Sequence, residues 1–144
     1  MPVVFVIARD WVLRTSVRAE LLEAGILAMG MESPDEVGQV IASGQLPAAI
    51  VVEAGAGLAD DSRISDLIAR VPAVLIASRV EIVPLPPAAA VFYRPVRIGE
   101  ITAKVQELAK KGPRRVSGWS RVRKTHENLR RIISAASVET ARNA

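Results

Sequence analysis

The chain has 144 residues, half of them hydrophobic, with a net charge of +4 and no cysteine. This length suits one domain with a short appendage, because the remainder is too short to fold alone. The apolar runs are far shorter than the roughly 20 residues of a membrane span, so we expect no membrane segment. The N-terminal run reaches Arg9 and Asp10 too early for a signal peptide, which predicts a cytoplasmic location. The lack of cysteine excludes disulfides, thiol catalysis and thiolate metal sites.

The charge is distributed unevenly along the chain. Residues 1–109 hold 9 basic and 13 acidic side chains, whereas the remaining residues hold 10 basic and 2 acidic ones. A basic tail on an acidic body indicates that the tail contacts an acidic surface, which is nucleic acid, an anionic partner or a second copy. A solvated basic helix is the alternative interpretation.

Short apolar runs with many β-branched residues recur along the chain. They occupy residues 3–7, 26–31, 48–52, 73–77 and 89–92. Runs that are apolar throughout are typical of strands covered on both faces, as in a parallel sheet.

Amphipathic helical patterns separate these runs. The first covers residues 11–24, ends at Gly25 and has an apolar stripe formed by Leu13, Val17 and Leu21. Ser33 and Pro34 predict the start of a second helix, as cap and first helical residue.

Two further helices are expected at residues 58–70 and 98–111, the former burying Ile64, Leu67 and Ile68. This alternation predicts a doubly wound α/β fold around a five-stranded parallel sheet with right-handed crossovers.

One helix is missing from the pattern. Residues 78–91 contain Pro84, Pro86 and Pro87, which cannot lie inside an α-helix without breaking it, so we expect the fourth helix to be absent or reduced.

The order of elements, the helix that ends at Gly25, Glu53 after the third strand and Arg94-Pro95 after the fifth resemble the receiver domain of two-component response regulators. The resemblance implies a flavodoxin-like fold for residues 1–112. In that family the first strand is followed by two acids for Mg²⁺, the third by a phosphoacceptor aspartate, the fourth by a hydroxyl and the fifth by a lysine. The matching positions here are Ala8 and Arg9, Glu53, Ser78 and Arg94.

The residues at these positions are unsuited to phosphoryl transfer. Ala8 offers Mg²⁺ no ligand and Arg9 repels it, and an alignment shifted to Arg9 and Asp10 still supplies only one carboxylate. The extra methylene of Glu53 moves its carboxylate into the space of a phosphoryl group. We therefore predict a degenerate site that is not phosphorylated, in which Glu53 pairs with Arg9, Arg94 or both. The alternatives are that Glu53 points into solvent and that Ser78 is an ordinary polar residue at a strand end.

Other chemistry finds little support in the sequence. Gly55 and Gly57 follow a strand, but the third glycine of a dinucleotide fingerprint is replaced by Asp60. His126 is the only histidine, which excludes a multi-histidine metal site and disfavours a serine hydrolase. We expect no enzymatic activity, no cofactor and no metal.

Residues 113–144 form a separate basic extension after the break at Gly112-Pro113. Its apolar positions alternate at spacings of 3 and 4, which predicts a helix with a coiled-coil seam formed by Trp119, Val122, His126, Leu129 and Ile133. Such a helix is marginal alone, so it packs on its own body or on a second copy, and the spacing favours a homodimer. The segment around His126 also loosely resembles the phosphoacceptor box of histidine kinases, although an ordinary helix histidine is the preferred interpretation.

The sequence as a whole predicts a pseudo-receiver that acts in signalling through protein–protein interaction and self-associates through its C-terminal helix. Its partners are then a second copy and another signalling protein, with no membrane involved. Two alternatives stay open, a nucleic-acid-associated regulator that uses the basic tail and an atypical phosphotransfer receiver.

Overall fold

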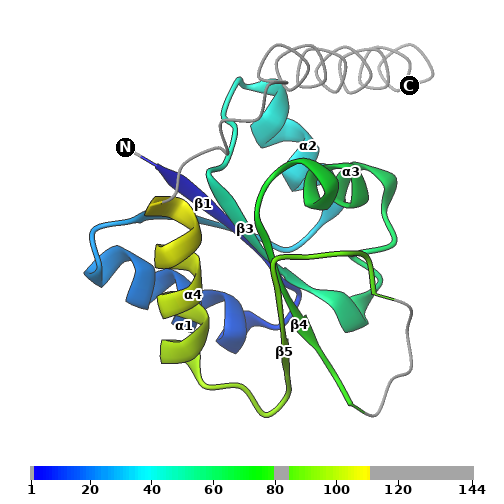
Figure 1. Ribbon diagram of the computed structural model, residues 1–144. Helices are drawn as coiled ribbons and strands as arrows, with labels where there is room; N and C mark the ends of the chain where they lie inside the picture. Colours follow the sequence, from blue (N-terminus) through cyan, green and yellow to red (C-terminus); the bar gives the residue numbers. More distant parts are fainter. Residues whose placement is uncertain (1, 80–84, 111–144) are drawn as a thin grey trace, which may run out of the picture.

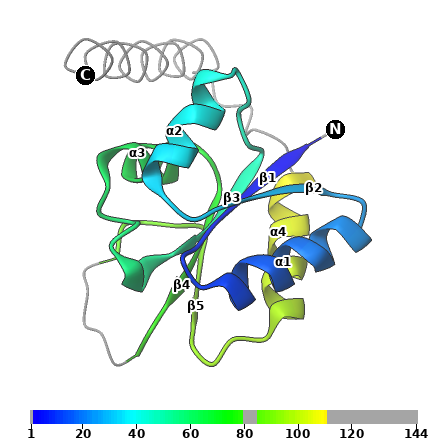
Figure 2. The same ribbon diagram turned by 180° about the vertical axis from the view of Figure 1, so that it is seen from behind.

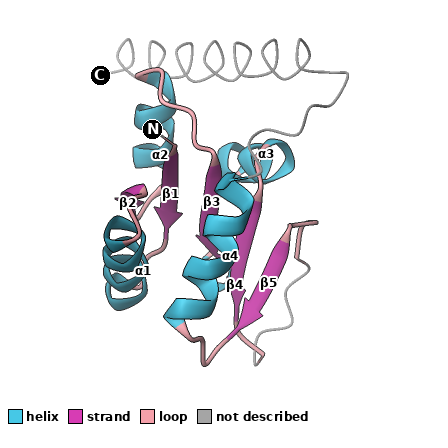
Figure 3. Ribbon diagram, turned by 60° about the vertical axis from the view of Figure 1, so that its left-hand side comes forward, coloured by secondary structure: helices cyan, strands magenta, loops and turns pink. Residues whose placement is uncertain are grey.

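Five parallel strands form one sheet in the computed structural model, which describes residues 2–79 and 85–110. They are β1 (Val3–Ile7), β2 (Leu27–Met31), β3 (Ala49–Glu53), β4 (Ala73–Ala77) and β5 (Ala90–Tyr93). Their order is β2-β1-β3-β4-β5 and all neighbouring pairs are parallel. Figure 3 shows β1, β3, β4 and β5 running in the same direction. The predicted parallel sheet is confirmed, and every strand begins and ends within one residue of its predicted position.

Helices cover both faces of this sheet. They are α1 (Trp11–Glu23), α2 (Pro34–Ala42), α3 (Ser62–Arg70) and α4 (Ile98–Lys110), with a short 3₁₀ turn, η1 (Ala54–Ala56), after β3. Figures 1 and 2 show α1 and α4 side by side on one face and α2 and α3 on the other. The doubly wound architecture predicted from the sequence is therefore confirmed.

The sheet separates two apolar cores. Alternate strand residues such as Phe5 and Ile50 pack under α2 and α3, while their neighbours, such as Val6 and Val51, pack under α1 and α4. Every residue of β3 and β4 is buried, as expected for strands covered on both faces. The runs of apolar residues in the sequence follow directly from this double coverage.

The helix ends follow the predicted signals. Gly25 adopts φ +81° after α1, in the left-handed region that favours glycine. Ser33 precedes α2, and its side chain accepts a hydrogen bond from the Glu36 N–H at 3.3 Å, with Pro34 as the first helical residue.

The third helix begins later than predicted. It starts at Ser62 rather than at residue 58, because the Asp61 carboxylate caps it by accepting from the Arg63 N–H at 2.9 Å. Gly57, at φ +74°, ends the preceding turn. Leu58 is nevertheless fully buried, so its apolar character reflects core packing outside the helix.

The segment between β4 and β5 contains no helix in its described residues, 78–79 and 85–89, as the prolines predict. Leu85 and Ala88 instead pack against the core on the α2 and α3 face. Residues 80–84 lie outside the described part. So does the whole C-terminal extension, residues 113–144, with its predicted seam of Trp119, Val122, His126, Leu129 and Ile133. Within the part that is described, no helix has the length and apolar character needed to cross a bilayer.

Candidate functional site

The predicted site lies at the carboxyl edge of the sheet. Arg9 and Asp10 follow β1, Glu53 ends β3 and Arg94 follows β5. Because the strands are parallel and adjacent in space, their carboxyl ends bring these residues together, which is where doubly wound folds gather functional groups.

Glu53 points into the fold and is surrounded by hydrogen-bond donors. Its Oε2 accepts from Arg94 Nη2 at 2.6 Å, and its Oε1 accepts from the backbone N–H groups of Arg9 at 2.9 Å and Asp10 at 3.3 Å. Only 11% of its side chain is exposed. A buried carboxylate is tolerated when a charge partner and hydrogen bonds replace its hydration, and both are present here. The alternative that Glu53 points into solvent is wrong.

Arg94 joins Glu53 to Asp10. Its second guanidinium nitrogen, Nη1, lies 2.9 Å from Asp10 Oδ2. The other oxygen of Asp10 accepts from the N–H groups of Val12 and Leu13 at 3.0 and 3.2 Å, which caps α1. These backbone hydrogen bonds, led by that of Leu13, and the Arg94 guanidinium hold the pKa of Asp10 below its ordinary value. One cation is thus shared by two carboxylates, one at the end of β3 and one in the loop after β1.

The two candidate partners of Glu53 contribute differently. The predicted contact with Arg94 is confirmed as a side-chain ion pair, whereas Arg9 contributes its backbone N–H. Among the described residues the Arg9 guanidinium makes no ion pair, and its side chain is exposed. Ala8 is buried in the core, and Ser78 lines an open cleft beside Arg94.

Sequence reasoning included Asp10 in the site but missed its role, and it missed the contribution of Arg14. Asp10 was weighed only as a metal ligand, although an aspartate directly before a helical pattern also signals a cap. Arg14 lies outside the apolar stripe of Leu13, Val17 and Leu21, yet its Nη1 donates to the Ala8 carbonyl at 2.6 Å and its side chain is only 16% exposed. This contact holds the β1–α1 loop, whose N–H groups bind Glu53. Nothing in the sequence distinguishes Arg14 from Arg18 in this respect.

Gly30 of β2 provides the space for Arg14. A Cβ atom at Gly30 would lie 3.1 Å from Arg14 Cγ and 3.2 Å from its Cδ, closer than side-chain atoms normally approach. The absence of a side chain at Gly30 therefore lets the Arg14 stem cross β2 on its way to the loop.

The donor set does not fit Mg²⁺, the ion that receivers use. A magnesium site needs several oxygen ligands in near-octahedral geometry. Ala8 has no side-chain oxygen, and the carboxylates of Asp10 and Glu53 are already engaged by Arg94. Arg94 places a fixed positive charge between the two acids, so a divalent cation there would face repulsion rather than an acidic pocket.

Comparison with known proteins gives a consistent result at the level of the fold. No protein-family model and no curated protein sequence matches the chain. A response regulator receiver protein from Burkholderia phymatum superposes with a TM-score of 0.62 at 17% identity, covering 76% of this chain and 96% of that one. A receiver-modulated diguanylate cyclase from Pelobacter carbinolicus gives 0.61 at 14% identity, with 77% and 94% covered.

A receiver domain of a Francisella response regulator gives a TM-score of 0.60 at 17% identity, with coverage of 77% and 98%. In each case nearly the whole of the other chain is matched, while about a quarter of this chain is not. The chain therefore contains one domain with the fold of response-regulator receivers.

Proposed function

We propose that the chain is a pseudo-receiver, a cytoplasmic signalling module that acts through protein–protein interaction and not through phosphorylation or catalysis. The observation that carries the proposal is the bridge from Arg94 to Glu53 and Asp10. In this proposal fixed charges occupy the place where a receiver binds a metal ion and a phosphoryl group.

The geometry of Glu53 supports the absence of phosphoryl transfer. A phosphoacceptor carboxylate must be free to attack, and the transferring group needs a cation to neutralise its charge. Glu53 accepts hydrogen bonds on both of its oxygens, and its only side-chain cation partner among the described residues is shared with Asp10. Attack by this carboxylate would require the bridge to open and leave Arg94 without its closest partner.

Intact-mass spectrometry tests this proposal directly. The protein is incubated with Mg²⁺ and acetyl phosphate, with a phosphorylatable receiver in the same mixture as the positive control. We expect the mass of this chain to stay unchanged while the control gains one phosphoryl group. A stable gain of one phosphoryl group on residues 1–112 would instead identify an atypical phosphotransfer receiver.

The proposal includes self-association through residues 113–144. The alternating apolar positions of this segment and its excess of basic over acidic residues support contact with the acidic body of a second copy. Light scattering should give a dimer for the full chain and a monomer for the Leu129→Glu, Ile133→Glu variant. A full chain that stays monomeric at high concentration would contradict this part of the proposal.

The same charge excess supports a second candidate function, nucleic-acid binding by the basic tail. Binding of this kind weakens steeply as salt rises, because phosphate contacts release counterions. A filter-binding series over salt concentration separates the two candidates, since seam variants should abolish dimerisation without abolishing a purely electrostatic association with DNA.

A further inference from the structure

An open cleft lies beside the Arg94 bridge, and Asp10 and Arg94 form part of its lining. Its volume is about 630 Å³, and it runs between the start of α1, the end of β4 and the loop from β5 to α4. Its apolar lining comes from Val12, Leu13, Pro95, Val96 and Ile98. Exposed apolar surface continues beyond the cleft at Trp11, next to Val12, with 65% and 64% of these two residues exposed. A cleft of this size and lining suits the burial of an apolar side chain.

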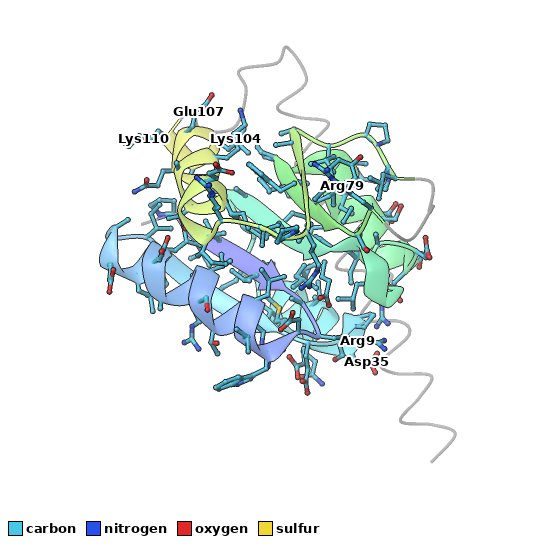
Figure 4. The ribbon with its side chains drawn as sticks, turned by 90° about the horizontal axis from the view of Figure 1, so that it is seen from below. Arg9, Asp35, Arg79, Lys104, Glu107 and Lys110 are labelled. Atoms are coloured by element: carbon cyan, nitrogen blue, oxygen red, sulfur yellow. The ribbon has the colours of Figure 1, made fainter. Side chains whose placement is uncertain are left out.

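The rim of the cleft is positively charged. Arg79 lines it and is exposed, with its guanidinium carbon 5.8 Å from the centre of the Tyr93 ring. Arg97 does not line the cleft itself, but it is exposed and lies between the lining residues Val96 and Ile98. Neither arginine forms an ion pair with any described residue. Figure 4 looks onto this edge of the molecule and shows Arg79 apart from Arg9, which lies near Asp35 in this view.

The two acids of the bridge do not neutralise Arg79 and Arg97. Asp10 and Glu53 are bound to Arg94, so Arg79 and Arg97 keep their charges for another partner. This positive edge contrasts with the body, in which acidic side chains outnumber basic ones. Charge complementarity therefore favours an anionic partner at this edge and disfavours one elsewhere on the body.

The arrangement of donors selects among anions. A phosphate group commonly binds to the free N–H groups at a helix start, but the Asp10 carboxylate occupies those of Val12 and Leu13. The available donors are guanidinium groups beside an apolar cleft, and guanidinium pairs well with carboxylate and with phosphate. The apolar lining favours a peptide with carboxylates over a phosphate group, because a peptide also brings an apolar side chain. An apolar group would enter the cleft while carboxylates stay at its rim.

We propose that this cleft binds a short acidic segment of a partner protein, with one apolar side chain in the cleft and carboxylates paired with Arg79 and Arg97. The inference rests on the proposed function, because it names the surface and the partner chemistry through which the pseudo-receiver would act. It leaves the Arg94 bridge intact, since neither arginine belongs to it.

Fluorescence anisotropy with designed peptides tests the inference on the full chain. The probe is a short fluorescein-labelled peptide with a central phenylalanine flanked by glutamates. Two matched peptides replace the phenylalanine by serine or every glutamate by glutamine. We expect the probe to bind and both matched peptides to bind at least about tenfold more weakly, which corresponds to about 1.4 kcal/mol.

Protein variants locate the binding surface. Arg79→Glu, Arg97→Glu should weaken probe binding at least about tenfold, since two pairs at an exposed rim become repulsive. Arg70→Glu is the matched control, because Arg70 is an exposed arginine at the end of α3, before β4 begins, and should leave binding unchanged. Val12→Asp should weaken binding through the cleft itself, and circular dichroism checks that each variant is folded.

Several results would overturn the inference. One is a dissociation constant above about 1 mM for the probe. The others are a loss of binding in Arg70→Glu equal to that in Arg79→Glu, Arg97→Glu, and binding of the glutamine peptide as tight as that of the probe. Displacement of the probe by inorganic phosphate at equal concentration would assign the rim to phosphate instead. The proposed function fails on a different result, a gain in mass after incubation with acetyl phosphate. That result does not depend on whether the peptide binds.

Discussion

Arg94 and Arg63 each bridge two acidic side chains from separate elements. The two arginines are similarly exposed, at 39% and 33% of their side chains, but one acid of the Arg94 bridge is buried. Arg63 contacts Asp61 before α3 and Asp35 in α2, at 3.3 and 3.0 Å. The Asp35 side chain is 83% exposed, whereas Glu53 in the Arg94 bridge is 11% exposed and also binds two backbone N–H groups. Exposed pairs contribute little to stability, while removing one partner of a buried pair leaves an uncompensated charge. The comparison separates a surface contact between two helices from a charge site built into the fold.

Replacing each arginine by methionine gives the largest expected difference, because methionine keeps much of the apolar stem and removes the charge. Arg94→Met should lower the free energy of unfolding by about 2 to 3 kcal/mol, since it leaves the buried Glu53 carboxylate without its cation partner. Arg63→Met should cost about 0.5 to 1 kcal/mol. Urea denaturation at neutral pH measures both values, and equal costs would show that the two bridges are equivalent.

Replacing one acid of each bridge by its amide tests the same comparison. In Glu53→Gln the amide keeps the shape of the side chain but loses the charge that pairs with Arg94, so we expect a cost of about 1 to 3 kcal/mol. Asp35→Asn, its counterpart in the exposed bridge, should cost less than about 1 kcal/mol. A wild-type denaturation midpoint for Glu53→Gln would contradict the buried-pair interpretation.

Much of the Arg94 bridge could be predicted from the sequence, because parallel strands fix where residues such as Glu53 and Arg94 meet. The sequence did not reveal which donor each residue would use. Arg9 contributes a main-chain N–H, and Asp10 both caps α1 and holds Arg94, which depends on the path of one loop. The cleft beside the bridge was also missed, since its lining converges from segments far apart in the chain, such as Val12 and Pro95.

The partners of Arg63 could not be predicted from the sequence for a related reason. It contacts Asp61, two residues away, and Asp35, which is distant in sequence, and charge patterns along the chain do not reveal such a pair. The lack of a helix in residues 85–89, by contrast, could be predicted from Pro84, Pro86 and Pro87, because proline excludes α-helix by its own geometry. Local rules were thus reliable for backbone conformation, and less so for side-chain partners.

A third test concerns the support of the buried bridge by Arg14, for which the exposed bridge has no equivalent. Gly30→Ala places a methyl group against the Arg14 stem and should disturb its hydrogen bond to the Ala8 carbonyl. We expect a cost of about 1 to 2 kcal/mol, from overpacking and the weakened hydrogen bond.

Gly99→Ala is the matched control for this change, because an added Cβ there meets no atom within 4 Å and the residue lies in α4. It should stabilise the protein by about 0.4 to 1 kcal/mol. In a double-mutant cycle, Arg14→Ala should cost less in the Gly30→Ala background than alone, because the two residues are in contact. Additive costs would show that Gly30 does not act through Arg14.

The smallest expected effect is a pH dependence that involves Asp10, the more exposed acid of the buried bridge. Its backbone hydrogen bonds and Arg94 hold its pKa below the ordinary value of 3.8. A lowered pKa in the folded state means that Asp10 stabilises the fold above the unfolded-state pKa, and that this contribution is lost as pH falls from about 4. Because the Asp10 side chain is 32% exposed, solvent limits the contribution to about 0.5 kcal/mol.

Asp10→Asn removes this titration but keeps a side chain that can cap α1. We therefore expect the variant to lose less stability than the wild type between pH 5 and pH 2, by about 0.5 kcal/mol, in urea titrations at each pH. Asp66→Asn corrects for the loss of one negative charge, because Asp66 is exposed and forms no ion pair with a described residue. If the two variants lose stability equally on acidification, Asp10 is not held by Arg94 in solution, and the bridge consists of Arg94 and Glu53 alone.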